Sequence, residues 1–247
     1  MINLKDKLIL VTGSGTGVGS GIASTLAKCG ADVVVHYNNS EKEADKTKEI
    51  INSLGRKCKL IKSNLKIVNE CRRTVDSAAE FLGGLDALVN NAGVALFGPI
   101  EDATSDLWRE VMATNLDGVF YLTQSLTGLL KKTKGTIVNI ASISGLRAST
   151  LRVAYGTSKA AVMQLTKQQA VELGEYGIRV NAVAPGPVRT KLAMEVHTQQ
   201  IIEAYHDHIP LNRYGSEREI GEVVYFLSSE KASYLTGQII AVDGGRS

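Results

Sequence analysis

Short runs of β-branched residues alternate with longer amphipathic segments along the whole chain, and this alternation constrains the fold more than any other feature. Consecutive parallel strands need a long crossover between them, which is usually a helix. Seven runs have the character of strands, and they span residues 8–11, 33–35, 59–61, 87–89, 137–140, 180–183 and 239–242. The predicted fold class is therefore α/β, a Rossmann-like, doubly wound sheet of seven parallel strands with helices on both faces.

The segments between these strands have the periodicity of helices and are long enough to cross the sheet. They span residues 19–29, 41–54, 68–81, 106–130, 154–175 and 217–227. With 247 residues and 4 prolines, the chain offers a large core and no convincing linker, so a single domain over 1–247 is predicted. Residues 188–214 depart from the rhythm, because a polar stretch follows the sixth strand. An insertion at that position is where we expect a substrate lid.

A glycine-rich segment, TGSGTGVG at residues 12–19, directly follows the first strand and opens the first helix. Glycines permit a tight turn there, and the helix N-terminus offers free N–H groups to a pyrophosphate. The same composition also occurs in ordinary flexible loops, but the position within a βαβ unit favours a dinucleotide site. The cofactor contacts predicted in this loop are Gly13, Ser14, Thr16, Gly17, Val18 and Gly19.

The end of the second strand indicates which dinucleotide is bound. Proteins that bind NAD usually carry an acidic residue at this edge for the ribose hydroxyls, and here none occurs before Glu41. Polar groups that can bind a 2′-phosphate follow the strand instead. NADP(H) is therefore favoured, and NAD(H) stays open because no arginine occupies the expected phosphate-binding positions. The contacts predicted at this edge are Tyr37, Asn38, Asn39 and Ser40.

Tyr155 and Lys159 lie four residues apart in a predicted helix, so the phenol and the ammonium share one face. A free tyrosine has a pKa of about 10, and a pKa of about 7 requires roughly 4 kcal/mol of differential stabilisation. A fixed neighbouring cation favours the phenolate and contributes to that shift. The same spacing also occurs on ordinary solvated helix surfaces, so the context of the pair decides its meaning.

In that context the whole chain resembles the short-chain dehydrogenase/reductase family. The glycine segment matches the family's glycine motif, and the run NNAG at residues 90–93 matches the segment after its fourth strand. Ser142 precedes Tyr155 by thirteen residues, the family's usual spacing, and Asn115 matches an asparagine in its fourth helix. The resemblance implies hydride transfer between a nicotinamide cofactor and a carbonyl or alcohol.

The resemblance also implies a role for each member of the catalytic set. Tyr155 would protonate the carbonyl oxygen in reduction, and Ser142 would hydrogen-bond that oxygen. Lys159 would lower the Tyr155 pKa and hold the ribose, and Asn115 would anchor a water that relays protons. Tyr155 and Lys159 are implied cofactor contacts as well. Further contacts are implied after the third, fourth and sixth strands, at Asn64, Leu65, Asn91, Ala92, Gly93, Pro185, Gly186, Val188 and Thr190.

Composition and charge exclude several other classes of protein. The net charge of +3 is dispersed, so neither a nucleic-acid surface nor a basic membrane patch is predicted. The three cysteines form no CxxC pair, and His206 and His208 have no evident third ligand, so no metal site is predicted. The polar start of the chain lacks the features of a signal peptide, and we expect a cytoplasmic protein. The family resemblance implies a homotetramer.

The leading hypothesis is an NADP(H)-dependent oxidoreductase that interconverts a ketone and a secondary alcohol. Within the family, the chain resembles 3-oxoacyl-carrier-protein reductases most, which implies a small carbonyl substrate or one bound to a carrier protein. A sugar or polyol dehydrogenase of the glucose type is the alternative within the same chemistry. A dinucleotide-sensing protein without catalysis is the alternative from another class, and the intact set Asn115, Ser142, Tyr155 and Lys159 disfavours it.

Overall fold

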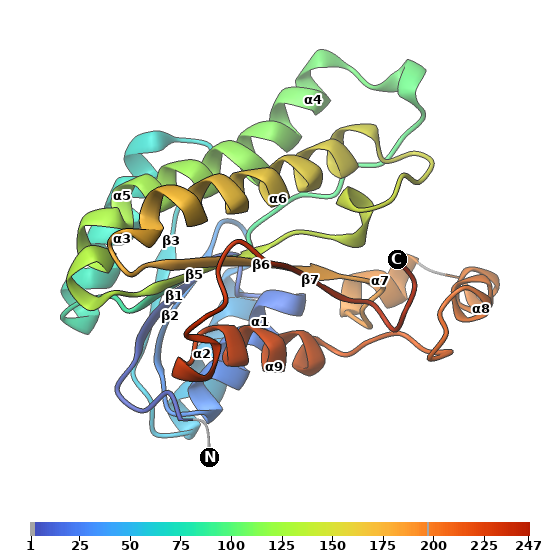
Figure 1. The fold of residues 1–247 in the computed structure, drawn as a ribbon. Coiled ribbons are helices and arrows are strands. Elements are labelled where there is room, and N and C mark those ends of the chain that lie inside the picture. Colours follow the sequence, from blue (N-terminus) through green and yellow to red (C-terminus); the bar gives the residue numbers. More distant parts are fainter. Residues whose placement is uncertain (1–2, 197) are drawn as a thin grey trace.

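The predicted strands pair side by side in one sheet in the computed structural model, which describes residues 3–196 and 198–247 (Figure 1). Neighbouring strands are parallel, in the order β3-β2-β1-β4-β5-β6-β7. The strands are β1 (Leu8–Val11), β2 (Asp32–Tyr37), β3 (Cys58–Lys62), β4 (Ala87–Asn90), β5 (Thr136–Ile140), β6 (Arg179–Pro185) and β7 (Ile239–Val242). The predicted fold class is confirmed, and the strand order reverses between β1 and β4, the position where such sheets bind ligands at their carboxyl ends.

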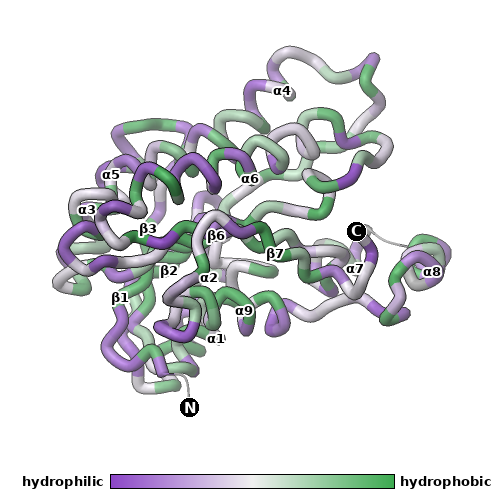
Figure 2. The backbone as a smooth tube through the Cα atoms, viewed as in Figure 1, coloured by the Kyte–Doolittle hydropathy of each residue, from purple (hydrophilic) through white to green (hydrophobic). Residues whose placement is uncertain are grey.

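Helices cover both faces of the sheet because successive strand residues point to opposite sides. In β1, Ile9 and Val11 pack into one apolar core, and Leu10 packs into the other. The helices α1, α2 and α9 cover the first face, and α3, α5 and α6 cover the second (Figure 1). Hydrophobic and hydrophilic residues alternate along these helices (Figure 2). The helices are α1 (Gly17–Lys28), α2 (Glu41–Ser53), α3 (Val68–Leu82), α4 (Ser105–Met112), α5 (Gly118–Thr133), α6 (Val153–Gly174), α7 (Lys191–Val196), α8 (Gln199–Asp207) and α9 (Glu217–Leu227).

The segment predicted as one helix over 106–130 differs from expectation. A π-helical turn, Ala113–Asp117, separates α4 from α5. Asn115 lies in this turn with its side chain fully buried, and it hydrogen-bonds the main chain of Val94 instead of facing solvent. Single π turns within α-helices frequently occur at functional sites. The irregularity thus ties the helix to the segment that follows β4.

The polar stretch 188–214 contains α7 and α8, and residue 197 within it lies outside the described residues. Figure 1 shows α8 projecting from the body of the protein. The end of the chain is bound to this stretch, because the Leu211 N–H donates to the carbonyl of Gly244 at 3.1 Å, a distance typical of backbone hydrogen bonds. That this stretch closes over a substrate stays a prediction. In the described part of the chain, no helix is both long and apolar enough to cross a bilayer.

Candidate active site

The glycine loop forms a narrow turn between β1 and α1. Gly13 has a φ of +59°, and a Cβ there would lie 2.7 Å from the Cα of Ala92. Gly19 packs so closely that a Cβ would overlap the Gly13 carbonyl oxygen and the Asn91 amide. The Thr12 hydroxyl accepts hydrogen bonds from the N–H groups of Asn91 and Ala92, both at 3.0 Å. The loop therefore presents backbone rather than side chains at the N-terminus of α1, a cradle that fits a pyrophosphate.

The polar residues after β2 lie beside this loop. Asn38 and Asn39 are exposed, and a Cβ on Gly15 would lie 3.3 Å from the carbonyl oxygen of Ser40. Thr16 occupies the N-cap position of α1 without a side-chain capping bond, and Ser40 does the same for α2. Their hydroxyls are thus not used to cap these helices. This edge fits the ribose and phosphate of a dinucleotide.

A cavity of about 220 Å³ lies at the carboxyl ends of β4, β5 and β6. The predicted residues that line it come from five separate stretches of the chain, and they are Val18, Asn91, Gly93, Ser142, Tyr155, Lys159, Pro185, Gly186 and Val188. Thr190 lies just outside, where its methyl group would be 3.6 Å from a Cβ on Gly17. The fold thus joins the glycine loop, the Tyr155 helix and the start of the polar stretch in one site.

Tyr155 and Lys159 lie on one face of α6, as predicted, and both line this cavity. Burial raises the pKa of Tyr155, while a hydrogen bond with Ser142 and the nearby charge of Arg152 lower it. The Lys159 ammonium donates to the carbonyl of Ile140 at 2.7 Å and lies 5.9 Å from the centre of the Tyr155 ring. The buried ammonium is thus bound to the main chain of β5, and the lowering of the Tyr155 pKa by Lys159 stays a prediction.

A family model described as enoyl-(acyl carrier protein) reductase matches residues 13–247. The chain is 38% identical over 245 residues to the 3-oxoacyl-[acyl-carrier-protein] reductase FabG of Aquifex aeolicus, covering 99% of this chain and 98% of that protein. It is similar in structure to a 7α-hydroxysteroid dehydrogenase complexed with NADH, with a TM-score of 0.94, 34% identity, and coverage of 98% and 95%. The Pseudomonas aeruginosa RhlG/NADP complex matches with a TM-score of 0.93 and 31% identity, covering 99% and 97%.

The chain belongs to the short-chain dehydrogenase/reductase family. It is accordingly an NAD(P)-dependent oxidoreductase that interconverts a ketone and a secondary alcohol. The close packing at Gly13 and Gly19 agrees with this assignment, because a side chain at either position would collide with Ala92 or with Gly13 and Asn91 and break the tight turn.

Three residues predicted to contact the cofactor of this dehydrogenase have their side chains directed elsewhere. The Ser14 hydroxyl donates to the Val11 carbonyl at 2.7 Å, and its N–H donates to the carbonyl of His36. Tyr37 packs in the core, and its hydroxyl hydrogen-bonds Glu41. Leu65 is buried in the opposite core. A cofactor contact at Ser14 or Leu65 would therefore use the main chain, and the predicted contacts at these three residues stay predictions.

Asn64 lies at the carboxyl end of β3, and its side chain remains near the surface. Its N–H donates to the Glu70 carboxylate, and its side-chain oxygen accepts from the N–H of Lys66 at 3.2 Å. These bonds hold the turn that starts α3. The side-chain NH₂ of Asn64 is a donor that an adenine edge could use, and this contact stays a prediction.

Asn115 uses its side chain to hold the loop after β4. Its oxygen accepts from Val94 N–H at 2.8 Å, and its NH₂ donates to the Val94 carbonyl at 2.9 Å and to the Ser158 hydroxyl at 3.0 Å. Both side-chain N–H groups are thus used, and the side-chain oxygen accepts one bond; that Asn115 anchors a relay water stays a prediction. The structure places Asn115 beside the site as a clamp between α6 and the loop.

Sequence reasoning missed His36, which supports the glycine loop from within. Its Nδ1 accepts from Gly13 N–H at 3.0 Å, and its Nε2 lies 3.1 Å from the Ser63 carbonyl. Burial lowers the His36 pKa to about 4, so the ring is neutral near pH 7 and Nδ1 can accept. Nothing in the sequence distinguishes this histidine from other polar residues in a strand. Its contact appears only when β2 lies beside β1.

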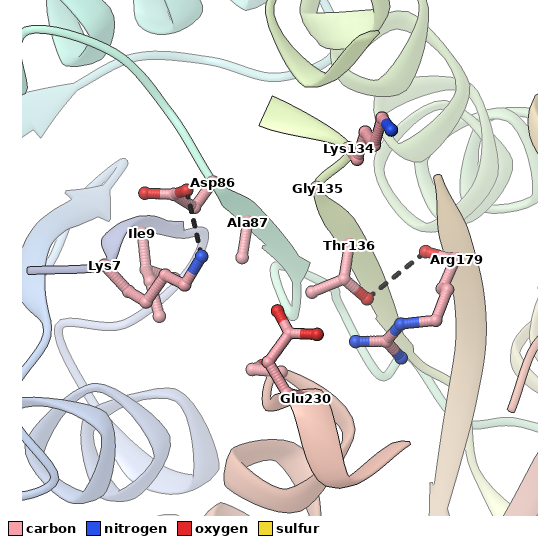
Figure 3. Close-up of a pocket in the computed structure, with 10 residues that line it drawn as sticks. Lys7, Ile9, Asp86, Ala87, Lys134, Gly135, Thr136, Arg179 and Glu230 are labelled. Carbon is pink, nitrogen blue, oxygen red and sulfur yellow. Dashed lines mark hydrogen bonds and ion pairs between the residues drawn. The ribbon is translucent and has the colours of Figure 1, made fainter. Parts of the chain in front are cut away.

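A second pocket lies at the opposite, amino-terminal edge of the sheet (Figure 3). It is lined by the first residues of strands, including Ala87, Thr136 and Arg179, and by the ion pair of Lys7 with Asp86 at 3.3 Å. Its volume of about 20 Å³ is of the size that holds one water. It therefore has no room for the family's substrates. Among the described residues, no three His, Cys, Asp or Glu side chains gather as a metal site would need.

Replacing Lys159 by methionine is expected to stabilise the folded protein near pH 7. Burial lowers the Lys159 pKa from its ordinary 10.5 to about 8. Keeping the ammonium charged in the folded state therefore costs about 3 kcal/mol of folding free energy. Losing the bond to the Ile140 carbonyl costs about 1–2 kcal/mol, so the net gain is about 1–2 kcal/mol. Urea unfolding at pH 7 measures this difference.

The same lysine gives a pH test. Between pH 8 and 10.5 the unfolded chain binds more protons at this site than the folded chain, so wild-type stability rises with pH in that window. The methionine variant should lack this rise. A variant that is less stable than wild type at pH 7, with the pH dependence retained, would contradict the buried-charge interpretation.

Proposed function

We propose that the chain reduces ketones with NADP(H) and that Ser142, Tyr155 and Lys159 carry out the proton chemistry. The observation that supports this most is their convergence in one cavity beside the glycine loop, although they come from the end of β5 and from α6. The bound nicotinamide supplies a hydride to the carbonyl carbon. Tyr155 donates its phenolic proton to the carbonyl oxygen, and the Ser142 hydroxyl hydrogen-bonds the same oxygen.

The proton that Tyr155 loses has to be replaced from solvent. Lys159 is buried and lines the same cavity, and its ammonium donates to the Ile140 carbonyl. Its remaining N–H groups would bind a ribose or a water. The main-chain carbonyl of Asn115 would anchor that water, since its side chain already holds Val94 and Ser158. Arg152 supports the anionic form of Tyr155, because its charge lowers the Tyr155 pKa.

The residues that would hold the cofactor divide by function. The backbone of the glycine loop would bind the pyrophosphate, and Asn64, Asn91, Ala92 and Gly93 would line the adenosine side. Pro185, Gly186 and Val188 would offer backbone groups to the carboxamide. The Thr190 hydroxyl, which now accepts from Ala193 N–H at 3.1 Å, would reach a phosphate.

NADPH is expected to bind more tightly than NADH. Asn39 and Ser40 after β2 and Thr16 at the start of α1 carry side-chain donors, and the first acid after β2 is Glu41, which lies in the first turn of α2. Two added hydrogen bonds to a charged phosphate give roughly 3 kcal/mol, or about a hundredfold in Kd. Fluorescence titration with both nucleotides measures the ratio. Tighter binding of NADH would overturn the preference.

For the substrate we propose a 3-oxoacyl thioester, free or attached to a carrier protein, as the name of the Aquifex relative suggests. Arg147 and Arg189 are exposed near the polar stretch and suit an acidic carrier. A sugar or polyol is the second candidate. A kcat/KM for reduction of a carrier-bound 3-oxoacyl chain at least tenfold higher than the kcat/KM for glucose oxidation would support the first candidate. The reverse order would favour the second.

We propose a homotetramer built on the outer faces of α5 and α6. Phe120 on α5 is 43% exposed and Val171 on α6 is 80% exposed, which leaves apolar side chains in contact with water. Covering such faces in a symmetric assembly would remove them from solvent.

A further inference from the structure

We call the cavity that Ser142, Tyr155 and Lys159 line the reaction cavity. A further cavity of about 230 Å³ lies next to it, and we call that one the tail cavity. It lies between the segment after β4, the first turn of α4 and the segment before α6. Most of its wall is apolar, from Leu96, Phe97, Pro99, Leu107, Leu151 and Val153. Among the described residues that line it, Asp102 alone carries a charge. A cavity with such a wall suits a hydrocarbon and disfavours an anion.

The tail cavity and the reaction cavity are neighbours along two segments of the chain. Val94 and Ala95 line the reaction cavity, and the next two residues, Leu96 and Phe97, line the tail cavity. In α6, Ala154 lines the tail cavity and Tyr155 lines the reaction cavity. A group held at Tyr155 therefore has the tail cavity beside it.

Phe97 stands between the two cavities. Its ring packs edge-to-face on Tyr155, with the centroids 5.8 Å apart, and the Arg152 guanidinium lies 4.6 Å from the centre of the same ring. Phe97 is nonetheless 52% exposed, and Leu151 beside it is 54% exposed. Clustered apolar side chains that remain this open commonly mark a ligand site.

We propose that the tail cavity binds the alkyl substituent of the carbonyl substrate. This inference rests on the proposed function, because it takes the carbonyl to be held by Ser142 and Tyr155. The cavity is smaller than the roughly 300–1,000 Å³ of a complete ligand pocket, so it suits one substituent of a larger molecule. A 3-oxoacyl thioester has two arms, and its alkyl arm would pass Phe97 while the thioester faces solvent. The substrate class is then a ketone with an unbranched, medium-length alkyl tail.

The test is a homologous series of 3-oxoacyl N-acetylcysteamine thioesters, from 3-oxobutanoyl to 3-oxodecanoyl, reduced with NADPH. Burial of each methylene is expected to raise kcat/KM about fourfold until the cavity is full. Gly98→Leu fills the cavity from its wall, since a Cβ on Gly98 meets no atom within 4 Å and the backbone there needs no positive φ. Ala103→Leu fills the same cavity from another segment, in case the first variant folds poorly. Both should abolish the gain per methylene.

Gly174→Leu is the matched control, because Gly174 ends α6 away from the cavity and a Cβ there also meets nothing within 4 Å. It should keep the wild-type dependence on chain length. A flat dependence in wild type, or an unchanged gain in both filled variants, would overturn the proposal.

A binding experiment separates this proposal from the proposed function. Decanoyl N-acetylcysteamine has the tail but no ketone, and its affinity is read by calorimetry. Binding at least tenfold tighter in wild type than in Gly98→Leu supports the tail cavity even if no ketone is reduced. Equal binding in wild type and both filled variants overturns it, even if every ketone is reduced.

Discussion

Replacing Tyr155 by phenylalanine is expected to lower kcat for ketone reduction by about 10²–10⁴-fold. The variant loses the proton donor while its ring keeps the edge-to-face packing on Phe97, whose centroid lies 5.8 Å away. The NADPH dissociation constant should change by less than about twofold, because the phenolic hydroxyl is one of many predicted cofactor contacts and the others are retained. Steady-state kinetics and a binding titration on the same preparation measure both quantities.

Tyr176→Phe is the matched control for this change. Tyr176 follows the end of α6 and lies beneath the Lys131 ammonium, which is 3.3 Å from the ring centre, a contact that phenylalanine also makes. It should keep wild-type kcat. If Tyr155→Phe keeps more than a tenth of wild-type kcat, Tyr155 is not the proton donor.

Replacing Gly19 by alanine is expected to disrupt the glycine loop. The added methyl group would overlap the Gly13 carbonyl oxygen and the Asn91 side-chain amide, neither of which is the end of a long flexible chain. Relieving such overpacking costs about 1–3 kcal/mol, which corresponds to about 10- to 100-fold weaker NADPH binding when the loop moves. Titration with NADPH measures this, and urea unfolding reports any loss of stability.

Gly128→Ala is the control for that substitution, because Gly128 lies within α5 and a Cβ there meets no atom within 4 Å. Alanine is the better helix former by about 1 kcal/mol, so this variant should be at least as stable as wild type and bind NADPH normally. Wild-type affinity in Gly19→Ala would show that the loop does not require its close packing.

The sequence was sufficient to predict the sheet, because the β-branched runs and their helical spacers repeat without interruption. It also located the glycine loop, Ser142, Tyr155 and Lys159, since each follows the carboxyl end of a strand or lies one turn from another on α6. Parallel strands bring such positions to one edge whatever the details of packing.

Contacts that depend on which way a loop residue faces were not predictable. Tyr37 ends β2, and Ser14 lies in the loop after β1. A side chain at either position can face solvent or the interior, and both side chains are buried. The support from His36 and the packing of Phe97 on Tyr155 join segments far apart in the chain. The π turn at Asn115 depends on hydrogen bonds to Val94 that the helical periodicity does not reveal.

The most direct test of the account is isotope transfer during turnover. The enzyme is incubated with 3-oxobutanoyl N-acetylcysteamine and NADPH that carries deuterium at the transferable position of its nicotinamide. We predict a secondary alcohol with one deuterium on the carbon that was the carbonyl, in an amount equal to the NADPH consumed. An enzyme that binds the labelled NADPH and forms no labelled alcohol from any ketone in an acyl, sugar and quinone series would contradict it.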